Sequence, residues 1–366
     1  MNPLKRLTEF GQSVYLDEIR RSWLTDGTLK RLIDDDGLRG VTSNPAIFHK
    51  AITQSNDYDE AVAALAASGL DAAAAYEELV VADIQGAADL FRAQHDASGG
   101  VDGYVSLEVS PELAHDAAGT LAEARHLWQR LGRPNVFIKV PGTDAGLEAI
   151  EQLIAEGINV NVTLLFGLKR YAQVVEAYLS GLERRLASGG DVRGVQSVAS
   201  FFLSRIDVLL DPQLDAQGAS ALRGKAAVAS AKLAYQLYLR EFGADSARWA
   251  KLSAAGAAPQ RLLWASTGTK DPSYPDVKYV EPLVGQDTIN TLPLDTLNAY
   301  RDHGDPADLI EHGVEQARAD VKALADLGVN LDEVEAQLET EGVDKFVKPF
   351  RQLIAGLDEA LRKAVA

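Results

Sequence analysis

The sequence predicts a closed (β/α)8 barrel of the TIM type. Eight short stretches rich in β-branched and aromatic residues alternate with helical stretches within roughly 280 residues. Such regular alternation with short connections indicates a parallel sheet, and eight units indicate a barrel. An open doubly wound sheet is the alternative, but it normally carries a glycine-rich phosphate loop after its first strand. Neither GxGxxG nor GxxxxGK[ST] occurs in this chain.

The predicted strands follow one another in order, and two of them run into a proline that ends the strand. They cover residues 13–19, 38–45, 103–110, 135–140, 159–166, 195–202, 261–267 and 277–284. The stretches between them are expected to be helical. The many alanines of 46–98 reflect strong helix propensity rather than low complexity.

No internal repeat of 20–50 residues and no Pro/Ser-rich linker divides the chain. We therefore expect residues 1–366 to form a single barrel domain. The chain exceeds what the eight units need, so helical additions are expected at about 212–258 and 286–366. The C-terminal helices are expected to pack on the barrel.

The composition argues against several classes of partner. A net charge of −17 over 366 residues disfavours binding to nucleic acid or to an anionic membrane surface. No apolar stretch of 18 residues occurs, and no apolar run follows Lys5 and Arg6, so we expect neither a membrane span nor a signal peptide. The acidic field also repels phosphorylated substrates. Any phosphate site must therefore be a local cluster of Arg, Lys and backbone N–H groups.

Cysteine and histidine usage narrows the chemistry further. The chain has no cysteine, which leaves no disulfide, thiol nucleophile or thiolate metal site and suits a reducing cytosol. The six histidines lack metal-ligand spacing such as HxxxH, and we interpret them as surface or packing residues. We expect a cytoplasmic protein without a metal site.

Lys139 is the central candidate for chemistry. It lies one residue from the end of the predicted strand 135–140, where Phe137 and Lys139 share one face and three Val and Ile side chains share the other. Desolvation lowers the pKa of an ammonium group, and a neutral amine is what Schiff-base chemistry with a carbonyl requires. The alternative is a lysine on an exposed strand edge, which has no such chemistry.

Polar residues collect at the ends of the predicted strands. In most strands they keep to one alternating face, which is costly on an inward face unless they bond one another or a ligand. Active sites of barrels gather at the C-terminal ends of the strands, so these residues are expected to converge on Lys139. The strand-end residues are Asp17, Thr42, Asn44, Glu108, Lys139, Asn161, Thr163, Ser200 and Ser266.

Several of these residues also have an ordinary structural role open to them. Asp17 could cap the helix that follows it. Asn44 could belong to a turn, since a proline comes next, and Glu108 could be an acid at the start of a helix.

A phosphate site is expected near the ends of the sixth and seventh strands. The loop Ser266-Thr-Gly-Thr-Lys270 is small, contains glycine and follows the seventh strand, where barrels often bind phosphate. It matches fragments of phosphate-loop and penicillin-binding motifs, but neither pattern is complete. Arg205 could bind the phosphate as well, or could pair with Asp207 at the surface.

Several motifs together resemble those of transaldolase, the class I aldolase-type enzyme family of the pentose phosphate pathway. The motifs occur in the family's order and cover the chain from about residue 10 to about residue 285. They are Tyr15-Leu-Asp17, Gly40-Val-Thr-Ser-Asn-Pro45, Val105-Ser-Leu-Glu-Val109, Ile138-Lys-Val-Pro-Gly-Thr143, Ile158-Asn-Val-Asn-Val-Thr-Leu-Leu-Phe166, and Ser200-Phe-Phe202 leading to Arg205.

The resemblance implies catalytic roles for four residues. Lys139 would form a Schiff base with the ketose carbonyl of the donor. Asp17 would act as general acid/base on the hydroxyl next to the cleaved carbon–carbon bond. Glu108, with Thr163 and a bound water, would move the protons needed to form and break the imine.

The resemblance also implies binding roles. Asn44 and Asn161 would hold the three-carbon dihydroxyacetone unit until an acceptor aldehyde arrives, and Ser200 would help to shape that pocket. Arg205, with Ser266 nearby, would grip the phosphate.

The implied reaction moves dihydroxyacetone from sedoheptulose 7-phosphate to glyceraldehyde 3-phosphate and needs neither metal nor cofactor. Its products are erythrose 4-phosphate and fructose 6-phosphate.

One departure from the family pattern concerns the phosphate. The family often has an arginine two residues after the serine of the seventh strand, whereas Thr267-Gly268 follows Ser266 in this chain. Lys270 could supply the charge instead, as a point charge rather than a bidentate fork.

Two rival functions stay open. An aldolase that releases free dihydroxyacetone would be favoured by a tyrosine hydroxyl at position 202, and Phe202 favours transfer instead. A sugar-phosphate-binding barrel without catalysis would lose Lys139 or one of the two carboxylates, all of which are present. Both a monomer and a homodimer are compatible with the sequence.

Overall fold

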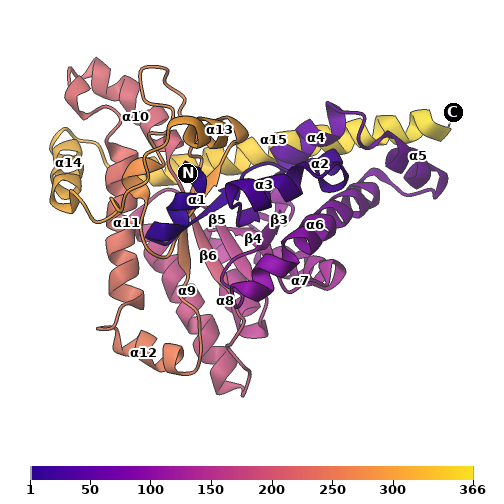
Figure 1. The fold of residues 1–366 in the computed structure, drawn as a ribbon, viewed down its shortest axis with the longest axis horizontal. Coiled ribbons are helices and arrows are strands. Elements are labelled where there is room, and N and C mark those ends of the chain that lie inside the picture. Colours follow the sequence, from indigo (N-terminus) through magenta and orange to yellow (C-terminus); the bar gives the residue numbers. More distant parts are fainter. Residues whose placement is uncertain (1, 366) are drawn as a thin grey trace.

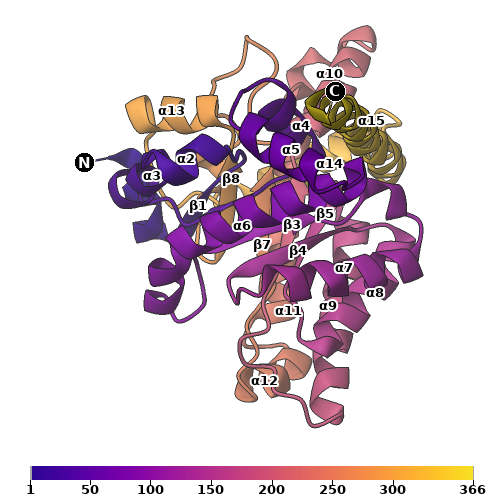
Figure 2. The same cartoon turned by 90° about the vertical axis from the view of Figure 1, so that its right-hand side faces the viewer.

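The computed structural model describes residues 2–365 and contains the predicted closed barrel (Figures 1 and 2). Its strands pair in sequence order, all in parallel, and the last pairs with the first. The strands are β1 Gln12–Leu16, β2 Gly40–Val41, β3 Tyr104–Glu108, β4 Val136–Pro141, β5 Val160–Leu165, β6 Ser197–Phe202, β7 Arg261–Ala265 and β8 Thr288–Leu292.

The eighth strand differs from the prediction. The stretch 277–284 forms turns and the 3-10 helix Glu281–Leu283, and the strand is instead Thr288–Leu292. Residue 282 is a proline, which cannot donate a hydrogen bond in a strand that has neighbours on both sides. The predicted C-terminal helical region of 286–366 therefore starts with a strand.

Helices surround the barrel and cover its outer face (Figures 1 and 2). The predicted helical stretch 46–98 is divided into three helices, and the region 212–258 holds the end of α10 together with α11 and α12. The helices are α1 Pro3–Arg6, α2 Arg21–Thr25, α3 Thr28–Asp36, α4 Pro45–Thr53, α5 Asp59–Ala67, α6 Ala72–Ala97, α7 Ala117–Leu131, α8 Asp144–Glu156, α9 Leu168–Ala187, α10 Ser204–Ala216, α11 Ala226–Phe242, α12 Ala247–Ala254, α13 Leu294–His303, α14 Val314–Asp326 and α15 Leu331–Val365.

The barrel interior is filled tightly at the level of β1 and β2. Tyr15 is fully buried and pairs in register with Gly40. A Cβ atom at residue 40 would lie 2.5 Å from the Tyr15 ring and 2.6 Å from the carbonyl oxygen of Tyr104, so the position requires glycine. Below this level Arg261 forms an ion pair with Asp102, with 3.2 Å between Nη1 and Oδ1. This closes the end of the barrel opposite to the predicted site.

The long helix α15 crosses the other end of the barrel, as the prediction of C-terminal helices on the barrel requires. It packs against α4, α5 and α6 and also contacts β5 and α10 (Figure 1). The crossing is close at Gly342, where an added Cβ would lie 3.0 Å from Leu164 Cδ2. Leu164 has a φ of 61°, a left-handed conformation that is unusual for a bulky residue and lies at a bulge of β5.

Candidate active site

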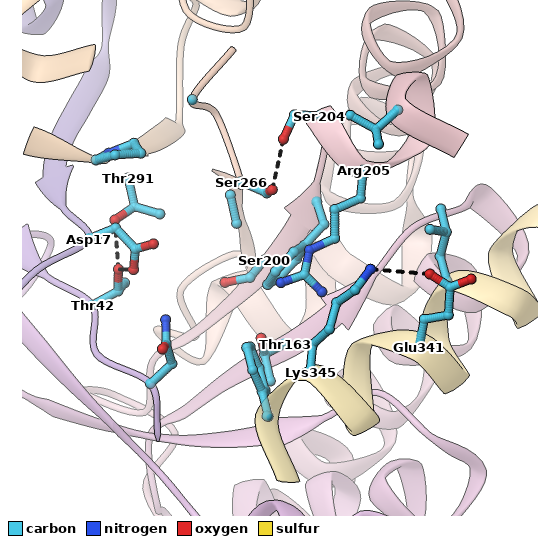
Figure 3. Close-up of a pocket in the computed structure, with 18 of the residues that line it drawn as sticks. Asp17, Thr42, Thr163, Ser200, Ser204, Arg205, Ser266, Thr291, Glu341 and Lys345 are labelled. Carbon is cyan, nitrogen blue, oxygen red and sulfur yellow. Dashed lines mark hydrogen bonds and ion pairs between the residues drawn. The ribbon is translucent and has the colours of Figure 1, made fainter. Parts of the chain in front are cut away.

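A pocket of about 460 Å³ opens at the C-terminal ends of the strands, beneath α15 (Figure 3). Nine of the eleven predicted site residues line it: Asp17, Asn44, Lys139, Thr163, Ser200, Phe202, Arg205, Ser266 and Lys270. The other two, Glu108 and Asn161, are absent from its wall and are buried among the residues that form its floor. The strand-end pattern thus brings together side chains that are far apart in the sequence.

Lys139 lies near the bottom of this pocket and is only 4% exposed. Its Nζ donates a hydrogen bond to the carbonyl oxygen of Ser43 over 2.9 Å. The same Nζ lies 3.2 Å from Oε2 of Glu108, with which Lys139 pairs in register across β3 and β4. The lysine is therefore an inward-facing, buried residue rather than one on an exposed strand edge.

The Glu108 carboxyl group is buried with few partners. Burial raises its pKa above the ordinary value, and the ammonium group of Lys139 offsets part of this rise. No N–H or O–H group among residues 2–365 donates a hydrogen bond to Oε1. Glu108 therefore has an acceptor atom free for a water or substrate hydroxyl, next to the amine.

Asp17 follows β1 directly and lines the pocket, across from Arg205 and Lys345 in the view of Figure 3. The hydroxyl of Thr42 donates a hydrogen bond to Oδ1 over 2.6 Å, and that hydroxyl also lies 2.7 Å from Oγ1 of Thr291. Burial raises the pKa of Asp17, and Lys139 and Thr42 offset part of the rise. The carboxyl group is thus oriented by the Thr42 hydroxyl and binds a proton more tightly than an exposed aspartate does.

The side chain of Asn161 hydrogen-bonds to two serines at the bottom of the pocket. Its Nδ2 donates to Oγ of Ser106 over 3.1 Å, and its Oδ1 accepts from Oγ of Ser200 over 2.7 Å. Thr163, two residues further along β5, is also buried but lines the pocket. Its Oγ1 has no hydrogen-bond partner among the described residues, so the hydroxyl is available to a ligand.

Asn44 caps a helix, rather than belonging to a turn as its sequence context suggested, and also lines the pocket. It is the N-cap of α4, where its Oδ1 accepts a hydrogen bond from the backbone N–H of Ile47 over 3.0 Å. Proline occupies the first helical position, as is common at the start of helices. Capping fixes the orientation of the amide, because its oxygen is engaged by the helix.

Arg205 lies at the start of α10 between two aromatic rings. Its Cζ is 5.2 Å from the ring centroid of Phe202 and 5.8 Å from that of Phe346, distances typical of cation–π contacts. The proposed surface pair with Asp207 is wrong, because that aspartate is buried and accepts hydrogen bonds from Tyr279 and the backbone of Ala227. Arg205 Nη1 is buried without a hydrogen-bond partner among residues 2–365.

The loop after β7 meets the start of α10 beside Arg205. Ser266 has a φ of 55°, and its Oγ lies 2.9 Å from Oγ of Ser204. The backbone N–H of Ser204 also donates to the carbonyl oxygen of Ser266. Lys270 is exposed at the rim, and its Nζ would be 3.6 Å from a Cβ added at Gly268. Hydroxyls and cations thus gather on one side of the pocket.

The sequence reasoning missed several pocket residues, among them Ser204, Val208 and Leu209 of α10, Thr291 of β8 and one face of α15. Thr291 was missed because the eighth strand was placed too early. The signal for it was the short run Thr288-Ile-Asn-Thr-Leu, which contains three β-branched residues and precedes a proline. The wall formed by α15 was missed as well. It contributes Leu338, Glu341, Lys345 and Phe346 at helical spacing, so one face of α15 faces the pocket.

Between residues 2 and 365 no cluster of three His, Asp or Glu side chains has the arrangement of a metal site. In the same part of the chain, every helix is too short or too polar to cross a bilayer.

Comparisons with known proteins agree on one family. The family model described as "Transaldolase/Fructose-6-phosphate aldolase" matches residues 14–357. The chain is 47% identical to "Transaldolase 2" of Nostoc sp., over 98% of this chain and 97% of that protein. It is 48% identical to "Transaldolase" of Arthrobacter sp., over 99% and 98% of the two chains. It is 49% identical to "Transaldolase" of Thiobacillus denitrificans, over 97% and 99%.

Proposed function

The chain belongs to the transaldolase/fructose-6-phosphate aldolase family, and we propose that it is a transaldolase with Lys139 as its nucleophile. The observation that carries the assignment of the nucleophile is the buried pair of Lys139 and Glu108 at the floor of a pocket that also holds Asp17 and Arg205. The substrate class is sugar phosphates. The donor is sedoheptulose 7-phosphate and the acceptor glyceraldehyde 3-phosphate, as in the pentose phosphate pathway.

The reaction begins when the Lys139 amine adds to the ketose carbonyl. Glu108, 3.2 Å from the nitrogen, takes the proton that Lys139 loses to become a free amine and passes it to the carbonyl oxygen. It then takes a second proton from the carbinolamine nitrogen and returns it to the hydroxyl, which leaves as water. Thr163 holds the water that carries these protons, through the hydroxyl that has no partner in the protein. The product is a protonated imine, which acts as an electron sink.

Carbon–carbon cleavage then requires only a base. Asp17 removes the proton from the hydroxyl of the carbon that leaves as the aldehyde, and the electrons of the broken bond move into the imine. The three-carbon unit stays on Lys139, held by Asn44, Asn161 and Ser200. When an acceptor aldehyde arrives, the steps run in reverse, and Asp17 returns its proton to the new hydroxyl.

Phosphate recognition is assigned to the side of the pocket where the loop after β7 meets α10. Arg205 has an unpartnered Nη1, and Ser266 and Lys270 lie on the adjoining wall. Phe202 stacks on Arg205 and keeps the guanidinium group in place.

Borohydride reduction in the presence of fructose 6-phosphate, followed by peptide mass spectrometry, tests the nucleophile. We expect a three-carbon adduct on the peptide that contains Lys139, because the imine is reduced while it carries dihydroxyacetone. If the sugar binds but no lysine is modified, the Schiff-base assignment is wrong.

Release of free dihydroxyacetone is the second candidate, because the family description names both activities. The relatives at 47–49% identity over nearly their whole length are named transaldolases, which favours transfer. Incubation with fructose 6-phosphate alone separates the two. A transaldolase forms one equivalent of adduct and stops, whereas an aldolase keeps releasing dihydroxyacetone.

The remaining proposals concern the whole molecule. We propose that residues 1–366 form one catalytic domain and that the enzyme works in the cytoplasm, since the chain has no cysteine that would require an oxidising compartment. The proposal covers a monomer or a homodimer, and light scattering at the concentrations used for kinetics distinguishes them.

A further inference from the structure

We propose that Lys345 and Glu341 of α15 form a phosphate gate, in which Lys345 binds the substrate's phosphate together with Arg205 and Glu341 competes for both cations. The inference rests on the proposed function, because it adds a specificity determinant to the same pocket. Both residues belong to α15, a helix that lies outside the eight βα units that build the rest of the site.

The charges that line the pocket are unevenly distributed. The cations are Lys139, Arg205, Lys270 and Lys345, whereas Asp17 and Glu341 are the acidic residues in its wall. This concentration of positive charge contrasts with the net charge of −17 for the whole chain. Since an acidic protein repels phosphorylated ligands, cations at the rim are needed to admit them.

Glu341 and Lys345 form an ion pair in the wall of this pocket, with 3.1 Å between Oε2 and Nζ. In Figure 3 the amino end of Lys345 is joined to the Glu341 carboxylate, on the same side of the pocket as Arg205. Hydrogen bonds from Gln337 and Lys345 lower the pKa of Glu341, and the charges of Lys345 and Arg205 lower it further. The Glu341 carboxylate thus pairs directly with Lys345, and its charge acts on Arg205 at longer range.

An ion pair at this spacing on a helix could be an ordinary surface pair, which contributes little to stability. Two further pairs on α15, Asp358–Arg362 and Glu359–Lys363, have the same spacing. None of those four residues lines the active-site pocket, whereas both members of the Glu341–Lys345 pair do. The Glu341–Lys345 pair therefore differs from the other two pairs in its location at the pocket, not in its spacing on the helix.

Arg205 supplies the fixed part of the phosphate site and Lys345 the mobile part. The guanidinium group is held between Phe202 and Phe346, with Nη1 unpaired among residues 2–365. The Lys345 side chain is 54% exposed and has a flexible stem, so it can leave Glu341 and reach a phosphate without movement of the helix. Phosphate is a dianion near neutral pH and attracts the ammonium group more strongly than a single carboxylate does.

The kinetic test compares phosphorylated with unphosphorylated substrates. We expect Lys345→Met to raise KM for fructose 6-phosphate and glyceraldehyde 3-phosphate about tenfold, the scale of one charge-assisted hydrogen bond. KM for glyceraldehyde as acceptor, measured at saturating donor, should change by less than about twofold, because this acceptor carries no phosphate. Glu341→Gln should lower KM for the phosphorylated substrates, because it frees both cations. Lys348→Met is the matched control on the same helix, since Lys348 is exposed and does not line the pocket.

A binding measurement separates this inference from the proposed reaction. Calorimetric titration of the full chain with inorganic phosphate requires no turnover. We expect weaker binding in Lys345→Met, tighter binding in Glu341→Gln and no change in Lys348→Met. These results would support the gate even if no lysine adduct formed with fructose 6-phosphate. Equal phosphate affinity in all variants, or a Lys345→Met effect that is the same for glyceraldehyde and its phosphate, would overturn it.

Discussion

Lys139 and Glu108 face each other across neighbouring strands, in register and with 3.2 Å between Nζ and Oε2. Both side chains are almost fully buried. A buried ion pair is a weak source of stability, because desolvation of the two charges offsets their attraction. The pair matters for catalysis instead, because it places the proton acceptor Glu108 beside the potential nucleophile Lys139.

Replacing Lys139 by Met should abolish transfer while leaving the fold intact. Methionine has a similar volume, and the uncompensated Glu108 can take up a proton, because burial already raises its pKa. The measurement is the transfer rate together with circular dichroism. Lys348→Met serves as the control for loss of a lysine. Turnover near the wild-type rate in Lys139→Met would remove the residue from its role.

Asp17→Asn should slow carbon–carbon cleavage by about 10²-fold or more, the usual scale for loss of a general acid/base. Asparagine can still accept the hydrogen bond from Thr42, so the local structure is kept. Imine formation does not use Asp17, and borohydride should still trap the intact donor sugar on Lys139. A variant that cleaves normally, or one in which no adduct can be trapped, would contradict the assignment.

Glu335 on α15 should make stability depend on pH. It is buried, its carboxylate faces the start of α9 at Gly167, and burial raises its pKa to about 7. Arg170 offsets part of that rise, while Asp332 and Glu339 add to it. Because the folded state binds the proton more tightly, the stabilising contribution is complete below the unfolded pKa of 4.5 and is lost as pH rises through 7.

Glu335→Gln, which cannot ionise, should remove this dependence. Relative to the wild type, the variant should gain up to about 3 kcal/mol in unfolding free energy between pH 4.5 and pH 8. Urea unfolding at several pH values measures the difference. Glu333→Gln, at an exposed position two residues away, is the control and should follow the wild type. Identical pH profiles for Glu335→Gln and the wild type would show that the carboxyl group is not the cause.

The closeness of α15 to the barrel can be tested with two glycines of the same helix. At Gly356 an added Cβ would meet Thr53 at an ordinary 3.7 Å, so Gly356→Ala should stabilise by about 0.5–1 kcal/mol through helix propensity. At Gly342 the Cβ would lie 3.0 Å from Leu164 and 3.6 Å from Arg205. Gly342→Ala should therefore be less stable than Gly356→Ala by about 1 kcal/mol or more.

The same pair of variants should differ in kinetics. Displacement of α15 at Gly342 moves the wall next to Arg205, so KM for phosphorylated substrates should rise in Gly342→Ala and stay unchanged in Gly356→Ala. Equal stability and equal KM in the two variants would mean that the helix has room to move.

Most of the barrel could be predicted because its strands are short β-branched runs that end at residues with special backbone preferences. The eighth strand shows the limit of this signal. Val277, Tyr279 and Val280 are as buried as strand residues, but they pack in a loop, and burial alone selects apolar side chains regardless of local conformation. The stretch 46–98 shows another limit, since helix propensity does not reveal where α4 ends and α5 and α6 begin.

The part of the site that lies on the strands could be predicted from the sequence, whereas the part that lies on α15 could not. Alternation along strands and the rule that barrel sites lie at strand C-termini bring Lys139, Asp17 and Thr163 into one pocket. No comparable rule applies to α15. Its amphipathic pattern indicates that one face is buried but not which surface it covers, so Phe346, whose ring centroid is 6.0 Å from Lys139 Nζ, could not be assigned.

The order of the elements has a consequence for synthesis of the protein. The ribosome makes β1 first, yet its second neighbour β8 follows about 270 residues later, and α15 comes after every strand. At the 5–20 residues per second of translation, about 14 to 54 s pass between the two strands. During that interval β1 presents an unpaired edge, which is prone to association with other chains. The nascent chain already carries its lysine and both carboxylates, but it gains the helix that covers the pocket and bears Lys345 only after the barrel can close.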